Sequence, residues 1–107
     1  MATGFPYDVD KNPLSCIDRF AAIQAKGIPI RRLGSAAIDL SYVAAGRFDA
    51  FWEVGLHAWD MAAGKLLIEE SGGKVTHWNG SPHQIFCYDT LLASNGSLHP
   101  TMIEYLK

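Results

Sequence analysis

Residues 52–64 of this chain read WEVGLHAWDMAAG. Polar and apolar positions alternate as far as Glu53, Gly55 interrupts the pattern, and helical spacing of apolar residues follows Asp60. The stretch therefore predicts a strand, a glycine-containing loop and a helix in succession. Ligands of α/β proteins bind at the carboxyl ends of strands and at the N-termini of the helices that follow them. We expect Glu53 and Asp60 to face such a crevice.

The rest of the chain continues this alternation. Helical patterns cover residues 12–27, 35–46, 60–73 and 100–107, and extended patterns cover residues 28–30, 48–53, 74–78 and 91–93. This order predicts one α/β domain over residues 1–107, with helices packed on a mixed, mostly parallel sheet. Both faces of the 48–53 strand contain apolar residues, so we expect helices on both faces of the sheet.

Composition favours a folded domain and argues against several kinds of partner. The chain has 107 residues, 49% hydrophobic and 19% charged, with a net charge of -2. Its mild acidity gives no electrostatic reason to expect nucleic acid or an anionic membrane as a partner. The apolar runs are too short to cross a membrane, and no signal peptide is recognisable. Cys16 and Cys87 fit neither a disulfide framework nor a zinc site, so we expect a reduced, cytoplasmic protein.

The candidate site residues each have a structural interpretation beside the functional one. Asp60 could cap its helix or bind a metal ion, and Glu53 could be a solvated residue at a strand end. Ser35 fits a helix cap better than a nucleophile, because no Ser/His/Asp order accompanies it. The backbone N–H groups of Gly34, Ser35 and Ala36 could bind an oxygen-rich ligand.

Other polar and aromatic residues favour structural roles. The four histidines have no zinc-binding spacing. Arg31 and Arg32 could contact an anion, although a surface or interface ion pair is the simpler interpretation. Asp39 falls on the polar side of its predicted helix and has no evident partner. Packing in the core or at its rim is expected for three residues: Trp52, Trp59 and Trp78.

Five short motifs are distributed along the chain, at residues 3–7, 31–37, 43–46, 59–64 and 69–73. They read TGFPY, RRLGSAA, VAAG, WDMAAG and EESGG. Together they resemble the C-terminal half of the inositol monophosphatase family of magnesium-dependent, lithium-sensitive phosphatases. The WDMAAG element corresponds to one of the family's two signatures. The resemblance covers essentially the whole chain, and it implies a five-layered αβαβα fold to which this chain would contribute the second sheet and its helices.

The resemblance also implies roles for individual residues. Asp60 would coordinate magnesium and so take part in catalysis, and Glu53 would hydrogen-bond an inositol hydroxyl. The backbone of Gly34, Ser35 and Ala36 would line the substrate pocket. The implied substrate is inositol monophosphate or a similar small polyol phosphate, and the implied parent protein is a homodimer.

The family's other signature, Asp-Pro-x-Asp-Gly-Thr, does not occur in the chain. The upstream glutamate that completes the family's metal cluster has no counterpart either. We therefore expect that the N-terminal metal-binding half is missing, and that the chain alone binds Mg²⁺ weakly and is inactive. Two alternatives remain open: a non-catalytic half-domain that associates through its exposed apolar surface, and a relative that acts on a sugar or nucleotide bisphosphate.

Overall fold

The structure, a computed structural model, describes residues 1–84 and 90–107. A four-stranded sheet at its centre has the order β1-β2-β4-β3. The strands are β1 (Ala2–Thr3), β2 (Ala50–Val54), β3 (Lys74–Thr76) and β4 (Thr90–Ser94). The helices are α1 (Cys16–Gln24), α2 (Ala36–Ala44), α3 (Ala58–Glu70) and α4 (His99–Tyr105), and two 3₁₀ turns, Val9–Lys11 and Pro13–Ser15, precede α1. The predicted α/β class is confirmed.

The sheet is mixed, as predicted, but the prediction that it is mostly parallel is wrong. Among the strands of the described residues, β1 and β2 pair in parallel, whereas β4 is antiparallel to both β2 and β3. The helix α3 does connect two strands of the same direction, β2 and β3. However, β4 inserts between them and converts the expected parallel pair into two antiparallel pairs.

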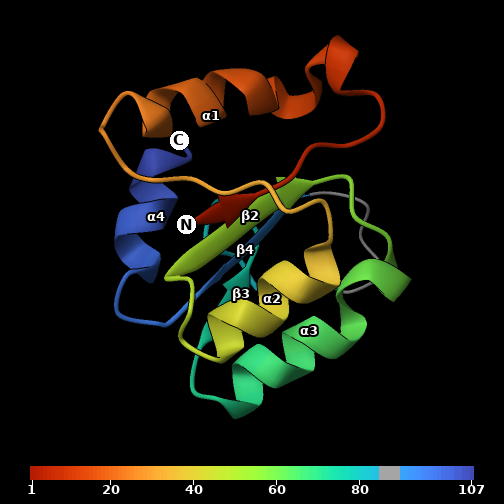
Figure 1. Cartoon of the computed structure of the whole chain (residues 1–107), viewed down its shortest axis with the longest axis vertical. Coiled ribbons are helices and arrows are strands. Elements are labelled where there is room, and N and C mark those ends of the chain that lie inside the picture. Colours follow the sequence, from red (N-terminus) through yellow and green to blue (C-terminus); the bar gives the residue numbers. More distant parts are fainter. Residues whose placement is uncertain (85–89) are drawn as a thin grey trace.

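Helices cover both faces of the sheet, as the pattern of residues 48–53 predicts. Phe51 points into a core shared with α2 and α3, while Trp52 points into a second core shared with α1 and α4. Figure 1 shows α2 and α3 side by side in front of the sheet, with α1 and α4 grouped together away from them. The end of β2 is therefore enclosed between the two layers.

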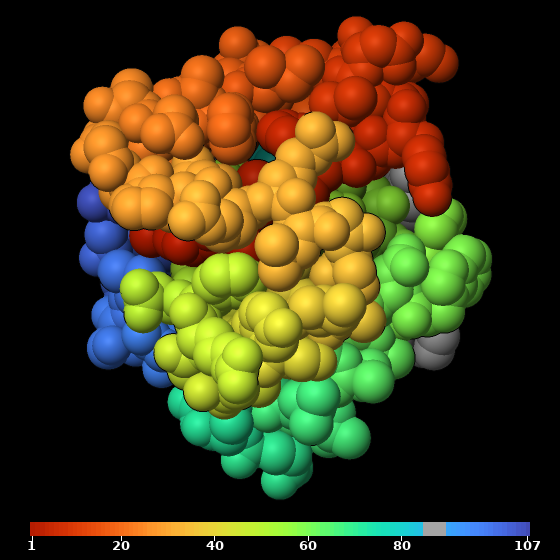
Figure 2. Space-filling model, in the orientation of Figure 1, coloured from red at the N-terminus to blue at the C-terminus, as the bar shows by residue number. Residues whose placement is uncertain are grey.

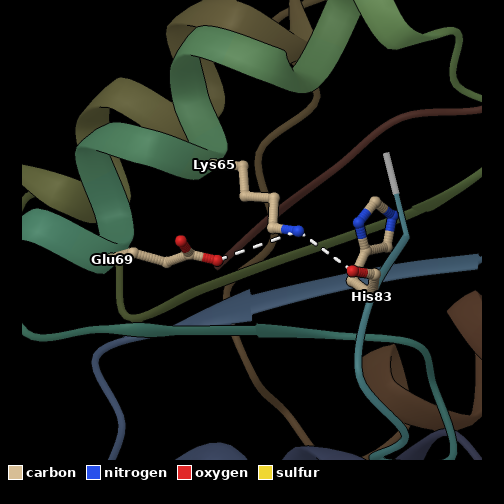
Figure 3. Close-up of polar contacts among 3 residues, drawn as sticks. All are labelled: Lys65, Glu69 and His83. Atoms are coloured by element: carbon tan, nitrogen blue, oxygen red, sulfur yellow. Dashed lines mark hydrogen bonds and ion pairs between the residues drawn. The ribbon is translucent and has the colours of Figure 1, made fainter. Parts of the chain in front are cut away.

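Close contact between α2 and α3 depends on a glycine. A Cβ atom added to Gly64 would lie 2.6 Å from the Cβ of Leu40. Lys65, one residue further along α3, donates a hydrogen bond of 2.9 Å to the backbone oxygen of His83 and lies 3.9 Å from the Glu69 carboxylate (Figure 3). The packing of Gly64 on Leu40 places α3 against α2, and the hydrogen bond of Lys65 joins α3 to the segment that follows β3.

The first helix begins later than its sequence pattern predicts. Asn12 has a left-handed φ of 49° and does not precede an α-helix; Pro13 instead starts a 3₁₀ turn, and α1 begins at Cys16. The Asn12 side chain still stabilises the helix start, since its Oδ1 accepts a 2.8 Å hydrogen bond from the Ile17 N–H. Cys16 is a buried free cysteine, and Cys87 lies outside the described residues.

In the part of the chain that the structure describes, no helix combines the length and the apolar character that crossing a bilayer requires.

Candidate functional site

A cavity of about 390 Å³ opens where β1 and β2 end. These two strands are parallel, so their carboxyl ends lie at the same edge of the sheet. The cavity walls come from residues 4–7, from residues between 32 and 39, and from residues between 53 and 60. In Figure 2 the corresponding red, orange-to-yellow and green segments meet on the face shown. This volume is in the range of small-ligand sites.

The N-terminus of α2 forms one wall of the cavity. Gly34 has a φ of 85°, which favours glycine at this turn. Ser35 is the N-cap of α2, and its Oγ accepts a 3.4 Å hydrogen bond from the Ile38 N–H, which confirms the predicted cap. Gly34, Ser35 and Ala36 all line the cavity. The structure thus brings together the backbone segment that the sequence singled out for ligand contacts.

Glu53 borders the cavity from the end of β2, on the same face of the strand as Phe51. It is half-buried, and a Cβ atom on Gly4 would overlap its carboxylate. The pKa of Glu53 is raised to about 7, mainly by burial and also by the negative charges of Asp39 and Asp60, while the charge of Arg32 opposes the shift. This burial contradicts the structural interpretation of the sequence, in which Glu53 is a solvated residue at the end of a strand.

Asp60 lies at the start of α3, but not at the predicted N-cap position. The helix begins at Ala58, so His57 is the N-cap and Asp60 is the third helical residue. Its Oδ2 accepts a 3.0 Å hydrogen bond from the His57 N–H, as one half of a reciprocal capping box. The carboxylate therefore stabilises the helix start through one oxygen, and the other oxygen is available for a ligand in the cavity.

Trp59 contradicts the prediction that all three tryptophans pack in the core or at its rim. Trp52 and Trp78 are buried, whereas Trp59 is 79% exposed. Its ring stacks on that of His57 with 4.3 Å between the centroids. Trp59 lines the mouth of the cavity instead of filling the core.

Asp39 is a cavity residue that the sequence analysis missed. It is 1% exposed, and its Oδ1 is buried without a hydrogen-bond partner among the described residues. Burial raises the pKa of Asp39 to about 6. The assignment to the polar side of the helix was wrong, because Asp39 lies three residues after Ala36 and four before Val43, on the buried stripe of α2. That spacing was the signal that could have identified it.

The two arginines have different surroundings. The Arg32 guanidinium lies 4.9 Å from the centre of the Phe5 ring and lines the cavity, where its charge partly offsets that of Glu53. Arg31 instead bridges to β1 through its backbone, donating to the Met1 oxygen at 2.9 Å. Neither forms an ion pair with another residue of the described ranges, so the predicted surface pair is absent there.

The cavity offers hard oxygen donors of the type that Mg²⁺ prefers. They are the carboxylates of Asp39, Glu53 and Asp60, of which Asp39 has an unpaired oxygen. However, residues 1–84 and 90–107 contain no group of three His, Cys, Asp or Glu side chains arranged to hold a metal ion. The donor chemistry fits magnesium, whereas the number of converging ligands falls short of a complete site.

Comparisons with known proteins identify relatives of this chain by sequence and by fold. The inositol monophosphatase family model matches residues 1–107. Inositol-1-monophosphatase of Caulobacter vibrioides is 44% identical over 107 residues, which are all of this chain and 42% of that protein. Nus factor SuhB of Pseudomonas aeruginosa is 44% identical over 97 residues, covering 89% of this chain and 35% of the relative. The chain thus spans about two-fifths of the length of the curated relatives that it matches.

Solved structures show the same similarity. The inositol monophosphatase from Anabaena superposes with a TM-score of 0.85 at 40% sequence identity, covering 98% of this chain and 43% of that chain. SaIMPase-II with bound inositol monophosphate superposes with a TM-score of 0.80 at 27% identity, covering 98% of this chain and 41% of that chain. From its sequence, its sheet and its cavity, the chain belongs to the inositol monophosphatase family.

Proposed function

We propose that this chain is the C-terminal part of a Mg²⁺-dependent phosphomonoesterase that hydrolyses inositol monophosphate or a related polyol phosphate. The main support is one observation: Glu53, Asp60 and the N-terminal backbone of α2 border the same cavity. The Caulobacter relative is named an inositol-1-monophosphatase, and a similar structure was solved with inositol monophosphate bound.

We assign each residue of the cavity a separate role in the proposed reaction. Asp60 would supply one carboxylate oxygen to magnesium, since its Oδ2 already accepts the His57 N–H. The bound ion would neutralise phosphate charge and activate the attacking water. Glu53 would bind a hydroxyl group of the substrate, and Gly4 leaves its carboxylate the room to do so. The N–H groups of Ser35 and Ala36, at the start of α2, would orient substrate oxygens.

We also propose that the remaining magnesium ligands come from an N-terminal half outside these 107 residues. The absence of a three-ligand cluster from residues 1–84 and 90–107 supports this assignment. Exposed apolar side chains near α2 and α3 offer a surface for such a half: Leu33, Ile38, Trp59, Leu66 and Leu67. A homodimeric, cytoplasmic parent enzyme remains a prediction of the family resemblance.

Two other functions have specific support. Several relatives are named Nus factor SuhB, a name other than that of a phosphatase, and the exposed apolar residues of this chain suit a role in protein association. A structure of SaIMPase-II contains 2′-AMP, which supports a related enzyme acting on nucleotide phosphates.

A chimeric enzyme tests the proposal. This chain would replace the matching segment of the Caulobacter relative, and phosphate release would be measured with inositol 1-phosphate, a sugar bisphosphate and 2′-AMP. We expect Mg²⁺-dependent release that is fastest with inositol 1-phosphate. A folded chimera without phosphatase activity would instead favour the association role, and faster release from 2′-AMP would favour the nucleotide alternative.

A further inference from the structure

The least expected feature of the cavity is its buried, unpaired carboxyl oxygen. Asp39 is 1% exposed, and no described residue donates a hydrogen bond to its Oδ1. Neither of the two ion pairs among the described residues involves Asp39. A buried acid without a partner strongly disfavours folding, so such groups are rare unless a ligand or water completes their hydrogen bonding.

Helix stability does not require an acid at this position. Ser35 already caps α2, and the Asp39 backbone N–H donates to the Ser35 oxygen at 2.9 Å within the helix. The immediate neighbour Leu40 and the next residue of the buried stripe, Val43, are apolar and buried. A leucine at position 39 would suit this stripe better than an unpaired carboxyl group. The acid therefore has a use other than packing.

Asp39 borders the same cavity as Glu53, but from a different element. Asp39 lies on α2 and Glu53 lies at the end of β2, and both line the cavity. They are close enough for the charge of Asp39 to raise the pKa of Glu53. Carboxyl groups accept hydrogen bonds from alcohol hydroxyls when ionised and donate them when protonated. Two such groups on two walls can bind two hydroxyl groups of one small molecule.

We propose that Asp39 is a second hydroxyl-binding residue of the cavity, which acts with Glu53 to select ligands that have several hydroxyl groups. The inference rests on the proposed polyol phosphatase function and adds a specificity-determining residue to it. A hydroxyl of a cyclitol or sugar alcohol would pair with the Asp39 Oδ1. A monohydroxy ligand would leave one of the two acids unpaired, and this penalty would produce the selection.

Binding of the neutral polyol myo-inositol tests the inference without turnover. The protein would be titrated with myo-inositol and with cyclohexanol as the hydroxyl-poor control, following the backbone amide NMR signals of the cavity. The variants are Asp39→Leu, which removes both oxygens, and Asp39→Asn, which keeps one acceptor. Asp10→Asn, at an exposed acid outside the cavity, is the matched control.

We expect the wild-type protein to prefer myo-inositol, and Asp39→Leu to reduce that preference about tenfold or more. Asp39→Asn should retain an intermediate preference, and Asp10→Asn should match the wild type. The thermal unfolding midpoint gives a second readout: Asp39→Leu should raise it, because an unpaired buried acid is removed. A lowered midpoint with unchanged preference would mean that Asp39 serves the fold and would overturn the inference.

Four further outcomes test the inference, and the last of them separates it from the proposed function. A wild-type protein without preference for myo-inositol, or an Asp39→Leu variant with full preference, would overturn the inference. If Asp39→Leu does not fold, unchanged preference in Asp39→Asn would overturn it in the same way. If Asp39→Leu loses the preference but this chain, joined to an N-terminal half with the acidic signature, releases no phosphate from inositol 1-phosphate, the inference stands and the phosphatase proposal fails.

Discussion

His99 and Asp39 are equally buried, each 1% exposed, but only one of them is paired. His99, on the side of the sheet covered by α4, shares hydrogen bonds through both ring nitrogens: Nε2 with Thr76 Oγ1 at 2.7 Å and Nδ1 with Ser94 Oγ at 2.6 Å. Asp39, on the side covered by α2 and α3, has an Oδ1 without a partner among the described residues. One side of the sheet thus pairs its buried titratable group with hydrogen bonds, and the other side leaves an oxygen of its buried titratable group unpaired.

This difference separates a structural region from the proposed ligand-binding region. The His99 network joins α4 to the ends of β3 and β4, and its polar atoms satisfy one another, which stabilises the fold. Around Asp39, polar groups converge on a cavity and leave hydrogen-bonding capacity for another molecule. Removing the Asp39 carboxyl group should therefore weaken ligand binding without destabilising the fold, and changes at His99 should lower stability without altering ligand binding.

The largest expected effect is on catalysis by Asp60. In the parent enzyme, which contains both halves, Asp60→Asn should reduce phosphate release from inositol 1-phosphate by about 100-fold or more, because a neutral amide is a poor magnesium ligand. An asparagine oxygen still accepts the His57 N–H, so the unfolding midpoint should change little. Asp10→Asn is the control. Unchanged turnover in Asp60→Asn would show that Asp60 caps the helix and has no role in catalysis.

A change at His99 should affect stability alone. His99→Ala leaves the hydroxyls of Thr76 and Ser94 without their partner and opens a cavity, so we expect a loss of about 3 kcal/mol in the free energy of unfolding. Chemical denaturation measures this loss, and Thr101→Ala, at an exposed position of α4, should change it by less than about 0.5 kcal/mol. A stable His99→Ala variant with weakened polyol binding would contradict the separation of the two regions.

The two buried groups should also give stability opposite pH dependences. Burial raises the pKa of Asp39 from 3.8 to about 6, so the folded state binds more protons than the unfolded state between these values, and stability falls as pH rises. Burial, with a smaller contribution from the Lys74 charge, lowers the pKa of His99 below 6.5. The unfolded state then binds more protons, and stability falls as pH drops below 6.5.

Denaturation of the wild type and Asp39→Leu between pH 3 and pH 7 isolates the contribution of Asp39 to the pH dependence of stability. The stability advantage of Asp39→Leu should grow by roughly 2 kcal/mol between pH 4 and pH 7, because the protonated acid is penalised less than the ionised one. An advantage that is constant over this range would show that folding does not raise the pKa of Asp39 from 3.8 to about 6.

The smallest expected effect is at Gly4. Gly4→Ala should displace the Glu53 carboxylate and raise KM for inositol 1-phosphate by about five- to tenfold, with a smaller change in kcat. Gly64→Ala is the comparison variant. Its added methyl group would displace the Leu40 side chain instead, and it should lower stability by about 1 to 3 kcal/mol. A Gly4→Ala enzyme with wild-type KM would mean that Glu53 does not contact the substrate.

Much of the fold could be predicted because it depends on local patterns. The Ser35 cap, the glycine-bounded helix that follows it and the two apolar faces of β2 are all recognisable in the sequence. The two antiparallel pairings of β4 could not be predicted, because the insertion of β4 between β2 and β3 is a long-range pairing without a local signature.

The candidate site was predicted in part. Glu53 and Asp60 were identified because they follow a strand and start a helix, and they do meet at one cavity. Asp39 was missed because its polar side chain suggested an exposed position, although its helical spacing placed it on the buried stripe. The contact of Gly4 with Glu53 depends on the pairing of β1 with β2, two segments that are far apart in the sequence.

Phosphate release by the 107-residue polypeptide alone tests the central claim most directly. With inositol 1-phosphate and Mg²⁺, the isolated chain should show no release above background, since in our proposal Asp60 would supply only part of a magnesium site. Adding an N-terminal half with the acidic signature should restore release, and Asp60→Asn should abolish it again. Mg²⁺-dependent turnover by the isolated chain would contradict the account, because its own side chains would then complete the site.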